Sequence, residues 1–196
     1  MKYIDIISKR RSIYDLNKNI LISESELNDL IISATKYTPS AFNSQTSRLI
    51  VLTKEKHEEL WDLILEEIKK VASKEGFEKT IEKINSFKAG FGTILYFEEL
   101  ETVRSLEEKF PTYKASFEGW SMQSNAMLQY SIWTALSDNN IGASLQHYNP
   151  IIDEAIREKY NVSKTWKLYA QMPFGGIGSR PNSYEVNNLD KRVIFK

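Results

Sequence analysis

The 196-residue sequence contains no cysteine. This absence excludes disulfide bonds, thiolate nucleophiles, iron–sulfur clusters and every zinc site that needs a cysteine ligand. It also favours a reducing compartment, because secreted domains often rely on disulfides, and we therefore expect a cytoplasmic protein. Histidine occurs only twice, at His57 and His147, in segments of different character. We expect no metal site.

Long apolar runs and net charge are also missing. The longest apolar runs, residues 49–52 and 94–97, are far shorter than the ~20 residues that cross a bilayer. The first fifteen residues hold no apolar run of signal-peptide length. The 26 Lys and Arg residues balance 26 Asp and Glu residues. A neutral chain has no general attraction for a phosphate backbone or an anionic membrane, so we expect neither nucleic acid nor membrane as a partner.

The residues that are present suffice for a packed core. Apolar residues make up 41% of the chain and aromatic residues 12%, which is typical of a globular protein. No Pro- or Ser-rich linker and no internal repeat divides the sequence. We therefore predict a single domain over residues 1–196.

Hydrophobic periodicity predicts helices and strands in irregular alternation. Ser23 and Glu26 form a capping-box pattern, and the helix that follows should end before Pro39. In the next, highly charged helix we place Val71 on the inner face, and we expect Gly142 to cap the most apolar helix. Further helices are predicted over residues 3–9, 54–73, 77–87, 120–135 and 151–160, and strands over residues 48–53, 93–97, 166–172 and 192–195. This order favours an α+β sandwich over a doubly wound sheet.

A basic cluster, Arg10, Arg11 and Ser12, follows the first predicted helix. Two guanidinium groups and a hydroxyl can make about four or five charge-assisted hydrogen bonds to a phosphate monoester. The arginines would equally suit the negative end of the helix, facing water. The residues alone leave both interpretations open.

A polar loop at residues 39–47 contains Ser40, Asn43 and Gln45. An amide offers a donor beside an acceptor, which matches the edge of a flat heterocycle. Loops rich in Ser and Asn also arise from turn chemistry alone.

Two later segments have polar or flexible character. Residues 144–149 bring an amide, an imidazole and a phenol together, and His147 would need a carboxylate partner to act as a general base. Residues 173–181 are glycine-rich and end near Arg180, but no Gly-Lys-Ser/Thr follows, so they form no Walker loop. Gly175 and Gly176 would serve a turn or let the backbone approach a phosphate closely.

Taken together and in this order, the segments resemble the nitroreductase family of FMN-dependent flavoproteins. The resemblance covers nearly the whole chain and is greatest for the small branch named after the yeast fatty-acid-repression mutant. It rests on Arg-Arg-Ser at residues 10–12, Pro-Ser-Ala-Phe-Asn-Ser-Gln at 39–45, Gly-Ala-Ser-Leu-Gln-His-Tyr-Asn at 142–149, Met-Pro-Phe-Gly at 172–175 and Lys-Arg-Val-Ile-Phe at 191–195.

The resemblance implies an α/β/α sandwich with a central, mostly antiparallel sheet, and a homodimer that holds FMN at its interface. By this resemblance the residues that bind the FMN phosphate are Arg10, Arg11, Ser12, Gly175, Gly176 and Arg180. Those that contact the flavin ring, partly across the dimer interface, are Ser40, Asn43 and Gln45. Those that lie along the flavin edge are Ser144, Leu145, Gln146 and His147. Phe42, Trp120 and Tyr148 are candidates to line the pocket for the electron acceptor, although Trp120 would fit the core equally well.

The implied activity is an oxidoreductase that passes two electrons from NAD(P)H through FMN to a nitroaromatic, quinone or similar acceptor by a ping-pong mechanism. No catalytic side chain is required, because the cofactor carries the chemistry. Where better-known members carry a lysine after the Arg-Arg-Ser segment, this chain has Tyr14, so Arg10 or Arg11 would supply the positive charge beside the flavin. Two alternatives are a flavin-binding stress or regulatory protein with little turnover, and an interaction module without a cofactor.

Overall fold

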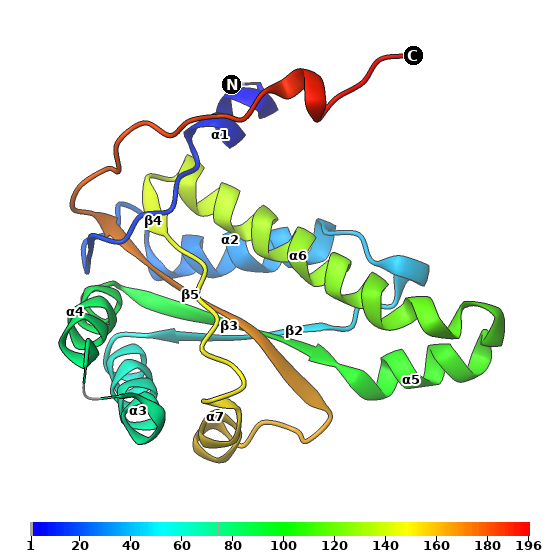
Figure 1. Ribbon diagram of the computed structural model, residues 1–196, viewed down its shortest axis with the longest axis horizontal. Coiled ribbons are helices and arrows are strands. Elements are labelled where there is room, and N and C mark those ends of the chain that lie inside the picture. The colour runs from blue at the N-terminus through cyan, green and yellow to red at the C-terminus, as the bar shows by residue number, and fades with distance from the viewer. Residues whose placement is uncertain (1, 74) are drawn as a thin grey trace.

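The computed structural model describes residues 2–73 and 75–196. Its helices are α1 (Tyr3–Lys9), α2 (Glu24–Tyr37), α3 (Glu55–Val71), α4 (Phe77–Lys88), α5 (Leu100–Lys109), α6 (Lys114–Asp138) and α7 (Asp153–Tyr160), and its strands are β1 (Leu16–Asn17), β2 (Ser47–Thr53), β3 (Gly92–Glu99), β4 (Ile141–Ala143) and β5 (Trp166–Ile177). Short 3-10 helices cover Ala41–Asn43, Pro111–Tyr113 and Leu189–Lys191. The sheet lies between α2 and α6 on one face and α3, α4 and α7 on the other (Figure 1). The predicted α/β/α sandwich is confirmed.

The sheet has the strand order β1-β5-β3-β2, and β4 also pairs with β5. Every ladder between these strands is antiparallel, as predicted. β3 is buried along its whole length, because strands flank both its edges and helices cover both its faces. β2 pairs only with β3 among the described strands, so one of its edges is open.

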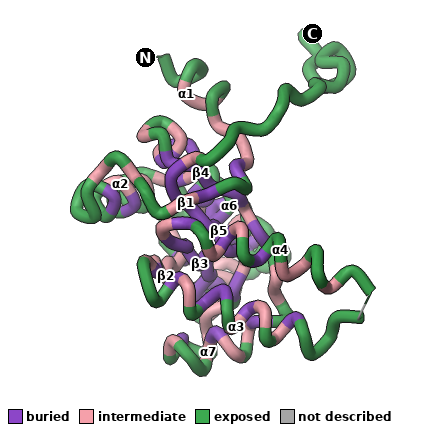
Figure 2. The backbone as a smooth tube through the Cα atoms, turned by 90° about the vertical axis from the view of Figure 1, so that its left-hand side faces the viewer, coloured by how far each residue is buried: buried purple, intermediate pink, exposed green. Residues whose placement is uncertain are grey.

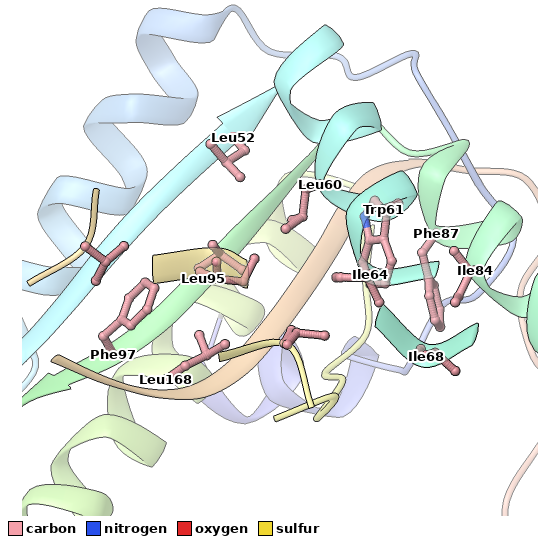
Figure 3. Close-up of a cluster of buried hydrophobic side chains, with 13 residues drawn as sticks. Leu52, Leu60, Trp61, Ile64, Ile68, Ile84, Phe87, Leu95, Phe97 and Leu168 are labelled. Carbon is pink, nitrogen blue, oxygen red and sulfur yellow. The ribbon is translucent and has the colours of Figure 1, made fainter. Parts of the chain in front are cut away.

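Alternating side chains of β3 feed two separate cores, because successive residues of a strand point to opposite faces. Leu95 and Phe97 pack with α3, α4 and α7, around the fully buried Trp61 (Figure 3). Ile94 and Tyr96 pack with α2 and α6. Both cores thus depend on the same central strand.

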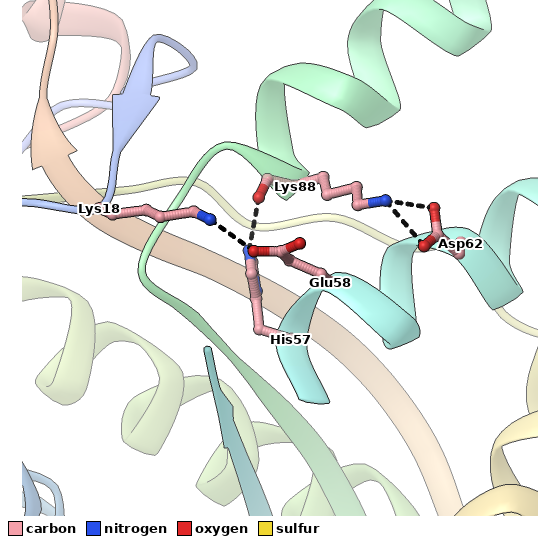
Figure 4. A network of polar contacts seen from close by, with 5 residues as sticks. All are labelled: Lys18, His57, Glu58, Asp62 and Lys88. Carbon is pink, nitrogen blue, oxygen red and sulfur yellow. Dashed lines mark hydrogen bonds and ion pairs between the residues drawn. The ribbon is translucent and has the colours of Figure 1, made fainter. Parts of the chain in front are cut away.

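A buried histidine connects α3 to the sheet and to the end of α4. The Nδ1 atom of His57 lies 2.8 Å from the Thr93 hydroxyl, and its Nε2 atom lies 3.2 Å from the Lys88 carbonyl. The indole N–H of Trp61 donates to the same Thr93 hydroxyl at 2.9 Å. Burial lowers the pKa of His57 to about 4, so the ring is neutral in the folded protein. Two ion pairs, Lys18–Glu58 and Lys88–Asp62, lie around this histidine (Figure 4).

Two predictions about helix ends are wrong. The buried stripe of α3 ends at Ile68, and Val71, the last residue of the helix, is 65% exposed. Gly142 does not cap α6 but pairs within β4, while Asn140 takes the left-handed conformation after the helix, with φ of 57°. Asparagine tolerates that conformation better than most residues. α5 and the first turns of α6 had no counterpart in the prediction.

The C-terminal third differs from the prediction in two places. β5 continues to Ile177, so Gly175 and Gly176 lie in a strand and not in a turn. The segment 192–195 is no strand, and its residues are exposed. A strand needs a partner, and no described strand of the chain lies beside this segment. The tail, residues 178–196, instead extends away from the sheet (Figure 2), and its Asn182 and Tyr184 contact Arg11.

Candidate functional site

The Arg-Arg-Ser segment runs from α1 toward β1 beside β4. Ser12 forms a parallel bridge with Ala143, and the Ile13 amide donates to the Ala143 carbonyl at 2.9 Å. The backbone here is therefore fixed to the edge of the sheet.

The Arg10 side chain lies on α6. Its guanidinium carbon is 4.2 Å from the centre of the Trp133 ring and 6.0 Å from that of Tyr130. Its Nε and Nη1 atoms are buried, and neither has a hydrogen-bond partner among the described residues. A half-buried guanidinium with two unused donor atoms is well suited to an anion, because leaving buried donors unpaired is costly.

Arg11 points the other way, toward the tail. Its Nη2 atom donates to the Asn182 carbonyl at 2.7 Å, and its guanidinium lies 4.7 Å from the centre of the Tyr184 ring. Arg180 is exposed on the same tail. In one chain, then, the structure does not bring Arg10, Arg11 and Arg180 to one point.

The polar loop before β2 has an unusual backbone. Phe42, Asn43 and Gln45 have φ values of 55°, 52° and 48°, in the left-handed region that residues other than glycine rarely adopt. The backbone amide of Gln45 donates to the Ser40 hydroxyl at 2.9 Å, and the backbone carbonyl of Gln45 accepts from Arg48 Nη1 at 2.7 Å. Strained residues that are held in this way tend to cluster at functional sites.

A pocket of about 500 Å³ lies between this loop, the end of α2 and α6. Lys36 and Arg48 line it, together with the three candidate residues Ser40, Asn43 and Gln45, and no carboxylate does. Within the described chain the side-chain amides of Asn43 and Gln45 have no hydrogen-bond partner, which leaves them available to a ligand. The full lining is Thr35, Lys36, Thr38, Pro39, Ser40, Asn43, Gln45, Ser47, Arg48, Ser124 and Leu128.

A second pocket of about 430 Å³ is largely apolar and borders the same loop. Phe42 and Trp120 line it, with ring centres 6.0 Å apart and planes inclined by 24°. Phe42 also contacts Phe110 and Phe117, at 4.9 and 5.3 Å between ring centres. Two nearly parallel aromatic rings suit a flat aromatic ligand.

Tyr148 does not join these two rings in one chain. It packs edge-on against Trp61, with ring centres 6.0 Å apart, in the core beneath α3. Burial raises the pKa of Tyr148 to about 12. Its backbone amide donates to the side chain of Gln171 at 2.8 Å.

The segment from Ser144 to His147 runs antiparallel to β5. Gln146 and Gln171 exchange two backbone hydrogen bonds, of 2.7 and 2.9 Å, and the Gln146 side chain donates to the Ser144 hydroxyl. Leu145 packs on the core of α2 and α6, and His147 is exposed. The backbone is thus held firmly, and the exposed imidazole is the side chain left open to a ligand.

The two glycines of β5 are required by close packing. A Cβ atom on Gly175 would meet the carbonyl oxygen of Asn17, and one on Gly176 would meet that of Asn19. Both glycines therefore let the chain after β1 pass directly over β5.

The candidate residues thus form two groups along α6. Arg10 lies at Trp133, whereas the loop reaches the helix where the Ala41 amide contacts the Ser124 hydroxyl at 3.4 Å. At 1.5 Å per residue these positions are about 14 Å apart along the helix. A single chain does not unite them.

The sequence did not reveal the roles of three residues that shape this geometry: Trp133, Arg48 and Gln171. Gln171 was detectable as the only side-chain amide in β5. Nothing in the sequence distinguishes Trp133 from a core residue. Within residues 2–73 and 75–196 no group of three histidine or acidic side chains could hold a metal ion, and no helix there is long and apolar enough to cross a membrane.

Comparison with known proteins places these features in a family. The family model described as "Nitroreductase family" matches residues 7–176. The chain belongs to the nitroreductase family. Nitroreductase HBN1 of Saccharomyces cerevisiae is 31% identical over 193 residues, covering 96% of this chain and 95% of that protein. Nitroreductase FRM2 of the same yeast is 26% identical, covering 95% and 94%. These relatives confirm the predicted family and its fatty-acid-repression branch.

Solved nitroreductases share the fold across their full length. CinD of Lactococcus lactis, determined in complex with 4-nitrophenol, has a TM-score of 0.90 and 37% identity, with all of both chains covered. A further CinD structure contains nicotinic acid and has a TM-score of 0.92 and 38% identity, again with full coverage. A Desulfitobacterium hafniense nitroreductase with bound FMN has a TM-score of 0.73 at 15% identity and covers 98% of this chain and 97% of its own, which shows the common fold.

Proposed function

We propose that this nitroreductase-family oxidoreductase uses FMN to pass two electrons from NAD(P)H to a nitroaromatic, quinone or similar acceptor by a ping-pong mechanism. FMN in a family member supports the cofactor. The ligands of CinD, a nitrophenol and a pyridine carboxylic acid, are of the ring types expected for acceptor and donor. The observation that carries the proposal is the half-buried Arg10, whose buried Nε and Nη1 donors have no partner among the described residues.

Arg10 would bind the FMN phosphate through these donors, and its stacking on α6 holds the guanidinium in place. Arg11, Ser12, Gly175, Gly176 and Arg180 remain the further candidates for the phosphate end. Arg11 would have to exchange its bond to the tail for one to the phosphate.

The loop would hold the flavin ring. The amides of Asn43 and Gln45 would bond to the alternating donors and acceptors of the ring edge, with the Ser40 hydroxyl fixing the loop. Ser144, Leu145, Gln146 and His147 would lie at the opposite edge. The lysine and arginine of the polar pocket would favour negative charge on a bound ring.

Bound FMN would supply the two-electron transfer between donor and acceptor. The chain's own contribution would be to bind and align the partners. Phe42 and Trp120 would receive the flat rings of donor and acceptor in turn, in an apolar slot that excludes water. Sharing one slot is the physical basis of a ping-pong order.

We further propose a homodimer with FMN at its interface. Arg10 and the loop meet α6 about 14 Å apart along the helix. In this proposal the loop of one protomer contributes to the FMN site of the other. The exposed apolar residues Met122, Met127 and Tyr130 of α6 offer a surface for such contact.

The tail offers a second contact between protomers. Val193, Ile194 and Phe195 are 53%, 71% and 94% exposed, in a short apolar run that pairs with no described strand. β2 has an open edge beside a groove of about 480 Å³ lined by Ile50, Val51 and Leu52 among others. Open edges invite strand addition, so the tail of one protomer would pair with β2 of the other.

The proposal also covers the setting: one domain of 196 residues, working in the cytoplasm, which a chain without cysteine suits.

The first experiment is a visible absorption spectrum of the purified protein, with heat release and chromatography of any cofactor. A yellow protein that releases about one FMN per chain and oxidises NAD(P)H faster than free FMN would support the proposal. Bound FMN without such oxidation would favour the regulatory alternative. A colourless protein that fails to bind added FMN would refute the FMN site.

A further inference from the structure

Trp133 has two independent contacts that converge on Arg10. The face of its indole ring lies 4.2 Å from the Arg10 guanidinium carbon. Its indole N–H donates to the Ala143 carbonyl at 3.1 Å, the same carbonyl that accepts from the Ile13 amide. The ring is therefore tied to the backbone that carries Arg10.

This arrangement limits where the guanidinium can lie. Stacking against an aromatic face holds the plane of a guanidinium without using its N–H groups. The Nε and Nη1 donors of Arg10 are buried and have no partner among the described residues. Such donors normally find a hydrogen-bond partner. Tyr130, one turn earlier on α6, lies 6.0 Å away and adds a second, weaker aromatic contact.

We propose that Trp133 is a positioning residue that holds the Arg10 guanidinium ready for the FMN phosphate. Trp133 then sets the preference of the protein for FMN over riboflavin, which has the same ring and ribityl chain but no phosphate. The inference rests on the proposed function, since it requires FMN to bind with its phosphate at Arg10.

The test measures dissociation constants for FMN and riboflavin by quenching of flavin fluorescence. Trp133→Leu should weaken FMN binding about threefold to thirtyfold, the range of a cation–π contact, and leave riboflavin binding unchanged. Trp133→Phe keeps an aromatic face and should lie closer to the wild type. Trp166→Leu, the same substitution at the start of β5, should leave the FMN-to-riboflavin ratio unchanged.

A double-mutant cycle tests the route through Arg10. Arg10→Ala should reduce the FMN-to-riboflavin preference, and Trp133→Leu should reduce it no further in that background. Equal losses of FMN and riboflavin affinity in Trp133→Leu would overturn the inference and make the tryptophan a packing residue. An unchanged ratio in both Trp133→Leu and Trp133→Phe would overturn it as well.

The wild type separates this failure from that of the proposed function. A wild-type protein that binds neither flavin refutes the FMN site itself. One that binds both equally shows that the phosphate makes no contact at Arg10, and the inference fails with it. A wild type that prefers FMN, combined with variants that keep the preference, refutes the role of Trp133 alone.

Discussion

The buried His57 makes a quantitative prediction about stability and pH. Its pKa is about 4 in the folded protein, against an ordinary value of 6.5, because burial disfavours the charged ring. Above pH 6.5 the ring is neutral in both states and contributes no pH dependence. Below pH 6.5 the unfolded chain binds a proton that the folded protein excludes, so the free energy of unfolding falls toward pH 4. A 2.5-unit difference corresponds to about 3 kcal/mol in total, and about 2 kcal/mol is lost by pH 5.

The assay is urea unfolding followed by tryptophan fluorescence, at pH 7.5 and pH 5, on the FMN-free protein. His57→Gln should be less stable than the wild type at pH 7.5, because the bonds to Thr93 and Lys88 are disturbed. It should nevertheless lose about 2 kcal/mol less between the two pH values.

The other histidine provides a matched control. His147 is exposed, so His147→Gln should lose as much stability on acidification as the wild type. Carboxylates add an acid slope common to all three proteins; Glu58, for example, has its pKa lowered by its hydrogen bond to Lys18. Equal losses in the wild type and His57→Gln would refute the reasoning, because they would show that His57 titrates normally in the fold.

Three further predictions concern the flavin site and the dimer. Arg10→Ala should weaken FMN binding on the order of 100-fold, the effect of losing charge-assisted hydrogen bonds to a phosphate. Arg11→Ala should weaken FMN binding less, because Arg11 already bonds to the tail. Isothermal titration calorimetry would rank the two variants, and the reverse order would contradict the assignment. Asn43→Gly should raise the free energy of unfolding of the apoprotein, measured in urea, by about 1 kcal/mol, because it relieves a left-handed φ. The same substitution should weaken FMN binding about tenfold, because it removes one hydrogen bond. Tighter FMN binding would show that Asn43 does not contact the cofactor. Deleting residues 191–196 should convert the dimer to monomer and lower its FMN content, measured by light scattering and absorbance, and an intact dimer would exclude the strand exchange.

The sequence allowed prediction of those elements whose cause is local. The helix that begins after Ser23 carries its own capping box, and the continuous apolar run within β3 reflects burial on both faces of the sheet. The segment 192–195 has the apolar residues of a strand but pairs with no described strand of the chain. A sequence pattern cannot show where the partner of a strand lies. Similarly, two adjacent glycines are expected in a turn and also in a strand that another segment approaches closely, so the sequence did not distinguish the two cases at Gly175 and Gly176.

The candidate site divides in the same way. The family motifs pointed to Arg10 and to the loop at Asn43 and Gln45, but they carried no information on how these residues lie in space. Their separation along α6 depends on tertiary packing, as does the role of Trp133, which is one aromatic residue among several on an apolar helix. The sequence likewise does not show that Arg10 and Arg11 point in opposite directions, because it presents only two adjacent arginines.

A shared site has a thermodynamic consequence for the whole protein. In a homodimer whose two protomers each supply part of the FMN site, FMN binds the dimer more tightly than the monomer, and by linkage FMN must stabilise the dimer by the same free energy. The left-handed backbone of Phe42, Asn43 and Gln45 adds to this coupling, because its strain is compensated by the contacts that hold the loop. Cofactor binding, loop geometry and dimer association are therefore coupled in this proposal. The unpaired donors of Arg10 are the groups of the single chain that FMN binding would satisfy.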